Sequence, residues 1–342
     1  MQNKLTKPGD LLNEKGHLIE CGYATKLIKK YDRNSIKAGK LRIKEWDYYL
    51  VYNSDYAVAL TIDDNSYMGL DSVSLIDFKN ATETTKSFMQ FMTKGKKNFP
   101  ATSEKGDVSF KTKNYSIEFL NNGKSRILKF FVKNFQKGVD FSGEFKLTHE
   151  PKDSMVIITP FAEKKTAFYY NQKIVGFQVD GFVQLNDTKI EFKDDSRGIL
   201  DWGRGVWTYK NTWYWGAGAG VVKGHEVGFN IGYGFGDTSA ASENMIFYDG
   251  KAHKLENVTF NIPTVNGKDD FMSPWTFTSS DGRFEMKFEP IINRRSNANV
   301  VVISSNQNQV FGKFSGTIIL DDKTKIKLKD FVGFAEKVMN KW

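Results

Sequence analysis

The residues from Asp201 to Gly220, DWGRGVWTYKNTWYWGAGAG, combine an acid, an arginine and four of the chain's seven tryptophans. A second acid, Glu243, follows in SENMIFY at the start of an apolar run. A carboxyl group against apolar surface has a raised pKa and can donate a proton, whereas a carboxylate paired with arginine stays ionised. Two acids in such different surroundings can take opposite roles in one site. This part of the chain therefore predicts acid/base chemistry.

Each charged residue has an expected role. Glu243 is the leading proton donor or base, and Asp201 is the second carboxylate. Arg204 orients Asp201 or binds an anionic group of the substrate. The side chains predicted to hold the substrate are Trp202, Trp207, Trp213, Tyr214, Trp215, Asn230 and Asn244. The structural alternative is that Asp201 and Arg204 form an ion pair or turn, with the tryptophans in the core.

Glycine recurs at alternate positions after the tryptophans, at Gly216, Gly218 and Gly220 and again at Gly228, Gly232, Gly234 and Gly236. Alternate residues of a strand share a face, so one face of each strand carries few side chains. Asn230 and Tyr214 are expected on these faces. The glycines serve either close packing and curvature or the approach of a ligand to the backbone.

Residues suited to metals or nucleotides are scattered. The four histidines and the single cysteine do not cluster in the sequence, which predicts no protein-built metal site. GAGAGVVKG lacks the spacing and the following helix of a dinucleotide fingerprint. No G-x-S-x-G motif is present. We therefore expect no cofactor.

Short runs with period two, broken by Gly, Asn and Asp, follow one another from Glu45 onward. They predict strands, and the Asn-Gly of LNNGKS and the Asp-Gly of SSDGRF predict hairpin turns. Helical periodicity is clear only in the C-terminal GFAEKVMNKW, with a weaker segment around Thr85 to Thr93. The chain is expected to be mostly β, with a short C-terminal helix.

Three segments recur in the same order, about 160 to 175 residues apart. EWDYYLVYNSDYAVALTI resembles NTWYWGAGAGVVKGHEVGFNI, SIEFLNNGKSRILKFF resembles WTFTSSDGRFEMKFEP, and VDFSGEFKL resembles GKFSGTIIL. An internal duplication into two consecutive lipocalin-like antiparallel β-barrels is predicted, because closure removes exposed strand edges. The expected units are a basic lead-in segment at 1–44, a first barrel at 45–190 and a second barrel at 191–342 that carries the site. A pair of β-sandwiches is the alternative.

The formal charge is +9, and Lys26 to Lys44 holds eight basic residues and one acidic. This segment is either a patch for phosphates, an acidic substrate or anionic lipid, or a solvated lead-in. Signatures of nucleic-acid binding are missing, so no nucleic-acid partner is expected. No apolar run reaches the roughly 18 residues of a membrane helix, and the N-terminal residues lack a signal-peptide core. With one cysteine, these features favour the cytoplasm and no integral membrane contact. They do not indicate an oligomeric state.

The chain resembles the family catalogued as domain of unknown function 2804 in DWGRGVWTYKNTWYWGAGAG, GFNIGYGFGDTSAASENMIFYDGKAHKL, FTSSDGRFEMKFEP and VFGKFSG. GDLLNEKGHLIECGYA, KEWDYY and PFAEKKTAFYYNQK extend the resemblance over essentially the whole length. The family name implies no activity. By its tandem plan, the chain is also similar to two-barrel lipocalin-like proteins, which include carotenoid hydratases and some cyclases. That likeness is one of architecture, and fold alone does not fix function.

Three functions remain open at this point. The first is a metal-free acid/base enzyme of the hydratase, isomerase, cyclase or lyase type, acting on a small, partly apolar ligand in a Trp-lined pocket of the second barrel. The second is a carbohydrate-active enzyme that uses the two carboxylates. The third is a non-catalytic carrier of an apolar small molecule.

Overall fold

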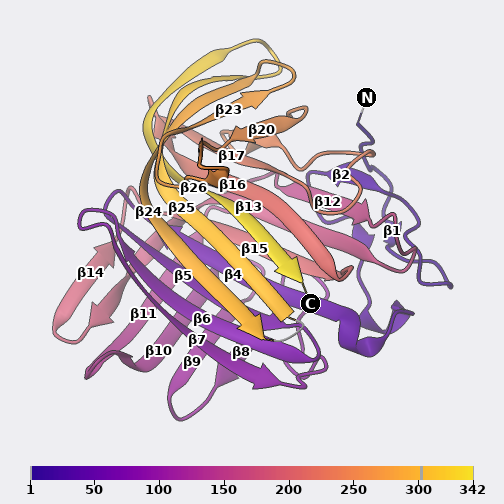
Figure 1. Ribbon diagram of the computed structural model, residues 1–342, viewed down its shortest axis with the longest axis horizontal. Coiled ribbons are helices and arrows are strands. Elements are labelled where there is room, and N and C mark those ends of the chain that lie inside the picture. Colours follow the sequence, from indigo (N-terminus) through magenta and orange to yellow (C-terminus); the bar gives the residue numbers. More distant parts are fainter. Residues whose placement is uncertain (1, 301–302, 342) are drawn as a thin grey trace.

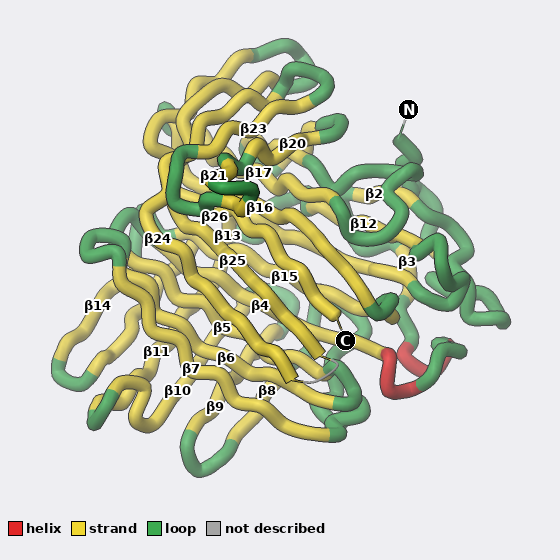
Figure 2. Tube along the Cα trace, in the orientation of Figure 1, coloured by secondary structure: helices red, strands yellow, loops and turns green. Residues whose placement is uncertain are grey.

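Residues 2–300 and 303–341 are described by the computed structural model shown in Figure 1. Most of them lie in antiparallel strands that form two large sheets, of 13 and nine strands. Helix is limited, in this part of the chain, to the 3-10 turns η1 (Arg33–Ser35) and η2 (Lys40–Arg42), which are red in Figure 2. The mostly-β prediction is confirmed.

The first sheet has ten strands along its main path. In spatial order they are β7 (Thr82–Phe91), β6 (Met68–Asp77), β5 (Tyr56–Asp64), β4 (Ile43–Tyr52), β15 (Arg197–Val206), β13 (Phe168–Leu185), β11 (Val139–Thr148), β10 (Arg126–Gln136), β9 (Tyr115–Asn121) and β8 (Val108–Lys111). Strands β12 (Met155–Pro160) and β14 (Thr188–Phe192) also pair with β13, and β2 (Gly22–Ala24) pairs with β12. A separate small sheet joins β1 (Gly9–Asp10) to β3 (Lys29–Lys30).

The second sheet follows a path of nine strands. In spatial order they are β19 (Lys251–Lys254), β18 (Met245–Tyr248), β17 (His225–Tyr233), β16 (Lys210–Val222), β26 (Lys325–Lys341), β25 (Ile303–Ile319), β24 (Phe284–Val300), β23 (Trp275–Ser279) and β20 (Val258–Asn261). The two-stranded sheet of β21 (Thr264–Val265) and β22 (Lys268–Asp269) completes the fold.

The two sheets repeat one plan, in agreement with the predicted duplication. The first pair of similar segments forms β4–β5 and β16–β17, the second forms the hairpins β9–β10 and β23–β24, and the third lies in β11 and β25. Removing β15 from the path of the first sheet leaves nine strands, which match the nine of the second sheet in order. Strand β15, where the tryptophan-rich stretch begins, is thus the strand added to the main path of the first sheet, and β2, β12 and β14 are added beside that path.

Both sheets curl, so that strands from opposite edges come together. In the first sheet, the Tyr115 ring of β9 stacks on the Phe88 ring of β7, with 3.7 Å between the ring centroids. The Tyr115 hydroxyl also donates a hydrogen bond to Asp71 of β6. In the second, Phe260 of β20 packs against Tyr233 of β17 at 5.6 Å. The molecule is therefore built from two curled antiparallel half-barrels.

The predicted helices are wrong. The C-terminal segment forms β26, a central strand between β16 and β25, and Thr85 to Thr93 falls mainly on β7. Ala335, Glu336 and Lys337 favour helix locally, but pairing with two neighbouring strands overrides that weak preference. Trp342 lies outside the described residues.

Two segments differ in placement from the sequence-based units. Strand β15 pairs with β4 and β13, so the chain changes sheet at residues 207–209, later than the expected boundary at 190–191. The N-terminal segment is packed rather than solvated, because Leu5, Leu11 and Tyr31 are buried. The Tyr170 hydroxyl donates to the Lys29 carbonyl and fixes this segment to the first sheet.

The inner face of the second half-barrel is filled by aromatic side chains. Phe229, Phe277 and Phe314 are fully buried there and pack ring against ring. A second core cluster spans both sheets and includes Trp215, Phe311 and Phe334 from the second sheet. The outer face of the second sheet therefore packs on the first sheet.

Candidate functional site

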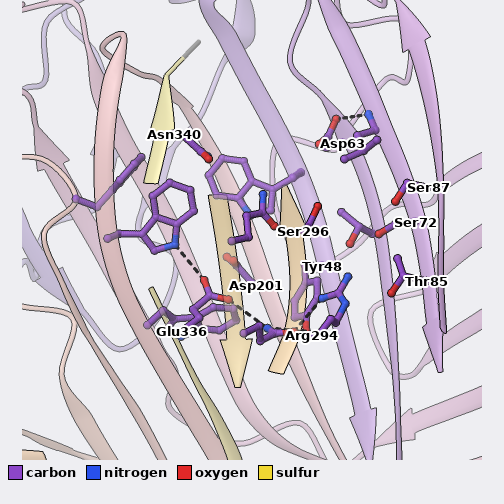
Figure 3. A pocket seen from close by; sticks show the side chains of 18 of the residues that line it. Tyr48, Asp63, Ser72, Thr85, Ser87, Asp201, Arg294, Ser296, Glu336 and Asn340 are labelled. Atoms are coloured by element: carbon purple, nitrogen blue, oxygen red, sulfur yellow. Dashed lines mark hydrogen bonds between the residues drawn. The ribbon is translucent and has the colours of Figure 1, made fainter. Parts of the chain in front are cut away.

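A cavity of about 510 Å³ lies between the two sheets (Figure 3). Strands β4 to β7, β13 and β15 line it from the first sheet, and β16, β24, β25 and β26 line it from the second. The expected position inside the second barrel is wrong, because aromatic rings occupy that interior. The volume is typical of sites that enclose one small molecule.

The first wall is a polar row that crosses six strands. Residues directly opposite each other in antiparallel strands share a face, so the row follows from the strand register. Its members are Lys173, Asp201, Tyr48, Thr61, Ser72 and Ser87. All six line the cavity, and Figure 3 shows Ser72 and Ser87 next to each other at one side of it.

The second wall faces this row from four strands of the second sheet. Trp215, Glu336, Gln309 and Arg294 lie opposite one another in β16, β26, β25 and β24. The Arg294 guanidinium donates to Gln309 Oε1 at 2.9 Å, and Gln309 Nε2 approaches the Tyr48 hydroxyl at 3.2 Å. Hydrogen bonds thus join the two walls across the cavity.

Asp201 is held as an ion pair. Lys173 Nζ lies 2.8 Å from Asp201 Oδ1, and the same oxygen accepts a hydrogen bond of 2.6 Å from Asn171 Nδ2. Lys173 also lies over the Trp215 ring, 3.9 Å from its centroid, in a cation–π contact. These contacts fix the Asp201 side chain in the cavity lining.

Glu336 has the opposite environment. It accepts hydrogen bonds from Trp213 Nε1 at 3.0 Å and from Gln309 Nε2 at 3.2 Å (Figure 3). Burial raises its pKa from 4.5 to about 7; the nearby Lys173 opposes this shift and the charge of Asp201 adds to it. The group can thus hold or release a proton near neutral pH.

Glu243 approaches the cavity from the segment before β18. Burial raises its pKa, while Lys173 and a hydrogen bond of 3.4 Å from Asn230 Nδ2 lower it. Asn230 is itself fixed by Trp215 Nε1, which donates to its Oδ1 at 2.8 Å. Gly232 leaves room for this carboxylate, because a Cβ there would lie 2.7 Å from Glu243 Oε1.

Aromatic rings close one side of the cavity. Trp207 makes edge contacts with Trp46 at 5.1 Å and with Phe235 at 4.8 Å, and Trp46 stacks on Tyr169 at 6.1 Å. Burial raises the pKa of Tyr169 well above its ordinary value, as do the charges of Asp201, Glu243 and Glu336. Its hydroxyl therefore stays protonated.

A further acid, Asp63, lines the cavity near the buried Lys44. Burial raises the pKa of Asp63 to about 7 and lowers that of Lys44 to about 7, and each side chain's charge opposes the shift of the other. The Lys44 ammonium group lies 5.4 Å from the centroid of the Trp207 ring. This end of the cavity thus adds a second acid that titrates near neutrality.

The structure brings together part of the predicted site. Asp201, Glu243, Trp207, Trp213 and Trp215 all line the cavity. Arg204 and Trp202 alternate with Asp201 along β15 and lie on its other face. There Arg204 pairs with Asp47 at 2.9 Å, so its predicted role beside Asp201 is wrong.

Three other predicted residues lie outside the cavity lining. Tyr214 is on the opposite face of β16, stacked on Tyr233 at 4.4 Å. The Asn230 side chain accepts a hydrogen bond from Trp215 Nε1 and donates one to the Glu243 carbonyl. The Asn244 side chain accepts a hydrogen bond of 2.7 Å from the Gly232 amide, which ties the segment before β18 to β17. The glycine-bearing faces of β16 and β17 are on opposite sides of the sheet, because the glycines of each strand lie opposite non-glycine residues of the other.

Glu336, Lys173, Tyr48, Gln309 and Arg294 were not predicted. Glu336 stood within the apparent C-terminal helix, and Lys173 came before the expected second barrel. These residues could be identified only from the register of long-range strand pairs, which a single sequence does not reveal. Within residues 2–300 and 303–341, no group of three metal-ligating acids, histidines or cysteines is found. No helix in these ranges has the length and apolarity to span a membrane.

The chain belongs to the family described as Domain of unknown function (DUF2804), whose model matches residues 2–342. No curated protein sequence matches the chain.

The chain is similar to solved structures, of which the first below shares its fold. A candidate AttH protein from Nitrosomonas europaea is 12% identical with a TM-score of 0.55, and the match covers 90% of this chain and 96% of that one. Kievitone hydratase from Nectria haematococca is 10% identical with a TM-score of 0.47, covering 98% of each chain. CghA is 9% identical with a TM-score of 0.42, covering 98% of this chain and 97% of that one.

Proposed function

We propose that this member of the DUF2804 family is an acid/base enzyme of the hydratase, isomerase, cyclase or lyase type. Its substrate would be a small, partly apolar molecule held in the cavity between the sheets. The observation that carries the proposal is the pair of Asp201 and Glu336 on facing walls of one cavity. One is held as an ion pair and the other has its pKa raised to about 7.

The residues support a division of roles. Protonated Glu336 gives its proton to a substrate carbon or to a leaving hydroxyl group. Ionised Asp201 takes a proton from the substrate or from attacking water, and Lys173 orients the carboxylate for that transfer through its ion pair. In the hydratase form, the double bond gains the proton of Glu336 and the oxygen of water, and the water's second proton goes to Asp201. Glu243 is the alternative donor, because its carboxyl group is also buried.

The cavity also supports the proposed substrate class. Trp207, Trp213 and Phe235 offer apolar surface at one side, while Thr61, Ser72 and Ser87 offer hydroxyl groups at the other. A molecule with an apolar body and one or two polar groups fits both sides. The hydroxyl groups also suit a sugar, so carbohydrate cleavage is an outcome that the experiment must separate.

The experiment begins with a thermal-shift screen of small compounds that combine an apolar body with a hydroxyl, carbonyl or alkene group, together with oligosaccharides. Compounds that stabilise the protein are then incubated with it and followed by NMR. We expect addition or loss of water, ring closure or isomerisation. Cleavage of a glycosidic bond would favour the carbohydrate enzyme, and unchanged bound compound would favour the carrier.

The decisive variant is Glu336→Gln, which keeps the shape and one acceptor oxygen, able to bind Trp213 Nε1, but removes the ionisable carboxyl group. We expect turnover to fall by roughly a hundredfold or more, with ligand binding within about threefold of wild type. The matched control is Glu289→Gln on the exposed side of β24. Equal turnover in Glu336→Gln and wild type would refute the assigned role.

A further inference from the structure

The wall of the cavity continues outward along β7. Glu83, Thr85 and Ser87 line the cavity, and Met89 and Phe91 share their face by strand periodicity. Met89 is 50% exposed and Phe91 is 77% exposed, and Met92 next to them is 44% exposed. We call Met89, Phe91 and Met92 the apolar rim.

The apolar rim is held in place by the sheet. Met89 lies opposite the cavity-lining Leu70 on β6, and Phe91 lies opposite Met68. The Met92 amide donates to the Tyr67 carbonyl at 2.8 Å. Ordered backbone therefore presents these three large apolar side chains to solvent, an arrangement typical of an interaction surface.

Positive charge flanks the apolar rim. From Thr84 to Ser103 the sequence has four lysines and no acidic residue, and three of these lysines are exposed while Lys97 is buried in an ion pair with Asp71. Lys94 and Lys96 are exposed immediately after the rim. Arg42 lies near Tyr67, where its charge opposes the rise in the pKa of that tyrosine, and its neighbour Leu41 is 42% exposed. The surface is thus an apolar centre with a cationic margin.

We propose that this end of the molecule docks on an anionic lipid surface. Phe91, Met92 and Met89 enter the boundary between headgroups and acyl chains, and Lys94 and Lys96 meet the lipid phosphates. A second copy of the chain is the less suitable occupant, because the lysines of two such surfaces would repel each other. Leu70, the strand partner of Met89, also lines the cavity. A molecule dissolved in the lipid could therefore pass from the docked rim into the cavity along one continuous wall.

The test is co-sedimentation of the full chain with vesicles. Phosphatidylcholine vesicles with about one third phosphatidylglycerol provide the anionic surface, and pure phosphatidylcholine is the neutral comparison. We expect binding to the anionic vesicles, weakening as salt is raised because lysine–phosphate attraction is screened. Absence of binding to anionic vesicles at low salt would overturn the proposal.

Two variants locate the surface. Phe91→Glu with Met92→Glu removes apolar insertion and should weaken binding at least tenfold. Lys94→Glu with Lys96→Glu should weaken it by about 25-fold or more, since each lysine near the surface is worth about fivefold. The control is Val221→Glu, an equally hydrophobic exposed site at 52% exposure near the β16–β17 turn.

The outcomes separate lipid from other occupants. Thermal melting of each variant confirms that it is folded before vesicles are added. If Val221→Glu weakens vesicle binding as much as the rim variants, the surface is misassigned. Light scattering without vesicles measures self-association, and a dimer that the rim variants abolish would identify a second copy as the occupant and contradict the proposal. None of these readouts uses catalytic activity, so the proposed enzyme function can fail independently.

Discussion

Glu336 and Asp201 are two carboxyl groups in one cavity that have different bonding partners. Asp201 gains a lysine at 2.8 Å, while Glu336 gains only neutral hydrogen-bond donors and loses water. Neutral donors compensate a buried negative charge less well than a cation does. The raised pKa of Glu336 therefore makes the stability of the fold depend on pH.

The pH dependence of stability tests this environment. Because the pKa of Glu336 rises from 4.5 to about 7 on folding, its stabilising contribution is complete below about pH 4.5 and is lost as pH rises through 7. Relative to wild type, Glu336→Gln should gain stability between pH 4.5 and pH 8, on the order of 3 kcal/mol. Urea denaturation of both proteins across that range measures the difference. Groups that titrate equally in both proteins cancel in this difference. If the unfolding free energies of the two proteins stayed a constant distance apart across this pH range, the assigned pKa would be contradicted.

At the level of single strands, close packing explains several glycines. Gly203 of β15 lies opposite Trp46 of β4, and the Trp46 ring lies across the space that a Cβ at 203 would occupy. The flat placement of Trp46 in the aromatic side of the cavity thus requires glycine in the neighbouring strand. Gly218 similarly faces the Phe229 ring in the aromatic interior of the second half-barrel.

Gly203→Ala should destabilise the protein by about 1 to 3 kcal/mol, because the Trp46 ring must move to admit the methyl group. The control is Gly39→Ala, which meets nothing within 4 Å and has φ of −54°. It should stay within about 0.5 kcal/mol of wild type. Equal unfolding midpoints for the two variants in guanidinium would show that the strand tolerates a side chain at 203.

Strands were predictable where one face is buried and the other exposed. In β9, Tyr115, Ile117 and Phe119 are buried in alternation, and the Asn-Gly turn after Asn121 marks the hairpin. The position of Asp201 among tryptophans was also visible in sequence. The partners of Asp201 were not, because Lys173 and Tyr48 become its neighbours only through pairing across 28 and 153 residues (201 − 173 and 201 − 48). Local patterns cannot determine such pairings.

At the scale of the whole molecule, the two half-barrels share one core cluster and direct ties. The Tyr52 hydroxyl on β4 donates to the Ala219 carbonyl on β16 at 2.9 Å and accepts from the Ala219 amide at 2.5 Å. These backbone groups lie beyond the residues of β16 that pair with β26. A side chain of one sheet thus completes the hydrogen bonding of the other.

Tyr52→Phe should lower the stability of both half-barrels together. Removing the hydroxyl leaves two buried backbone groups of Ala219 without this partner, at a cost of about 1 to 3 kcal/mol. Tryptophan fluorescence and far-UV circular dichroism should report one coincident transition, shifted to lower urea. Tyr56→Phe, at the half-buried end of β5, is the control and should leave the midpoint unchanged. Two separated transitions would show that the half-barrels unfold independently.

The position of β26 has a consequence for the order in which the chain can fold during translation. Strand β26 lies between β16 and β25, so the second sheet lacks a central strand until residues 325–341 have left the ribosome. The first sheet closes earlier, when β15 joins β4 to β13. The nascent chain would therefore carry a finished half-barrel and an open one at the same time. The cavity gains Glu336, and the strand that completes its second wall, only after β16, β24 and β25 have been made.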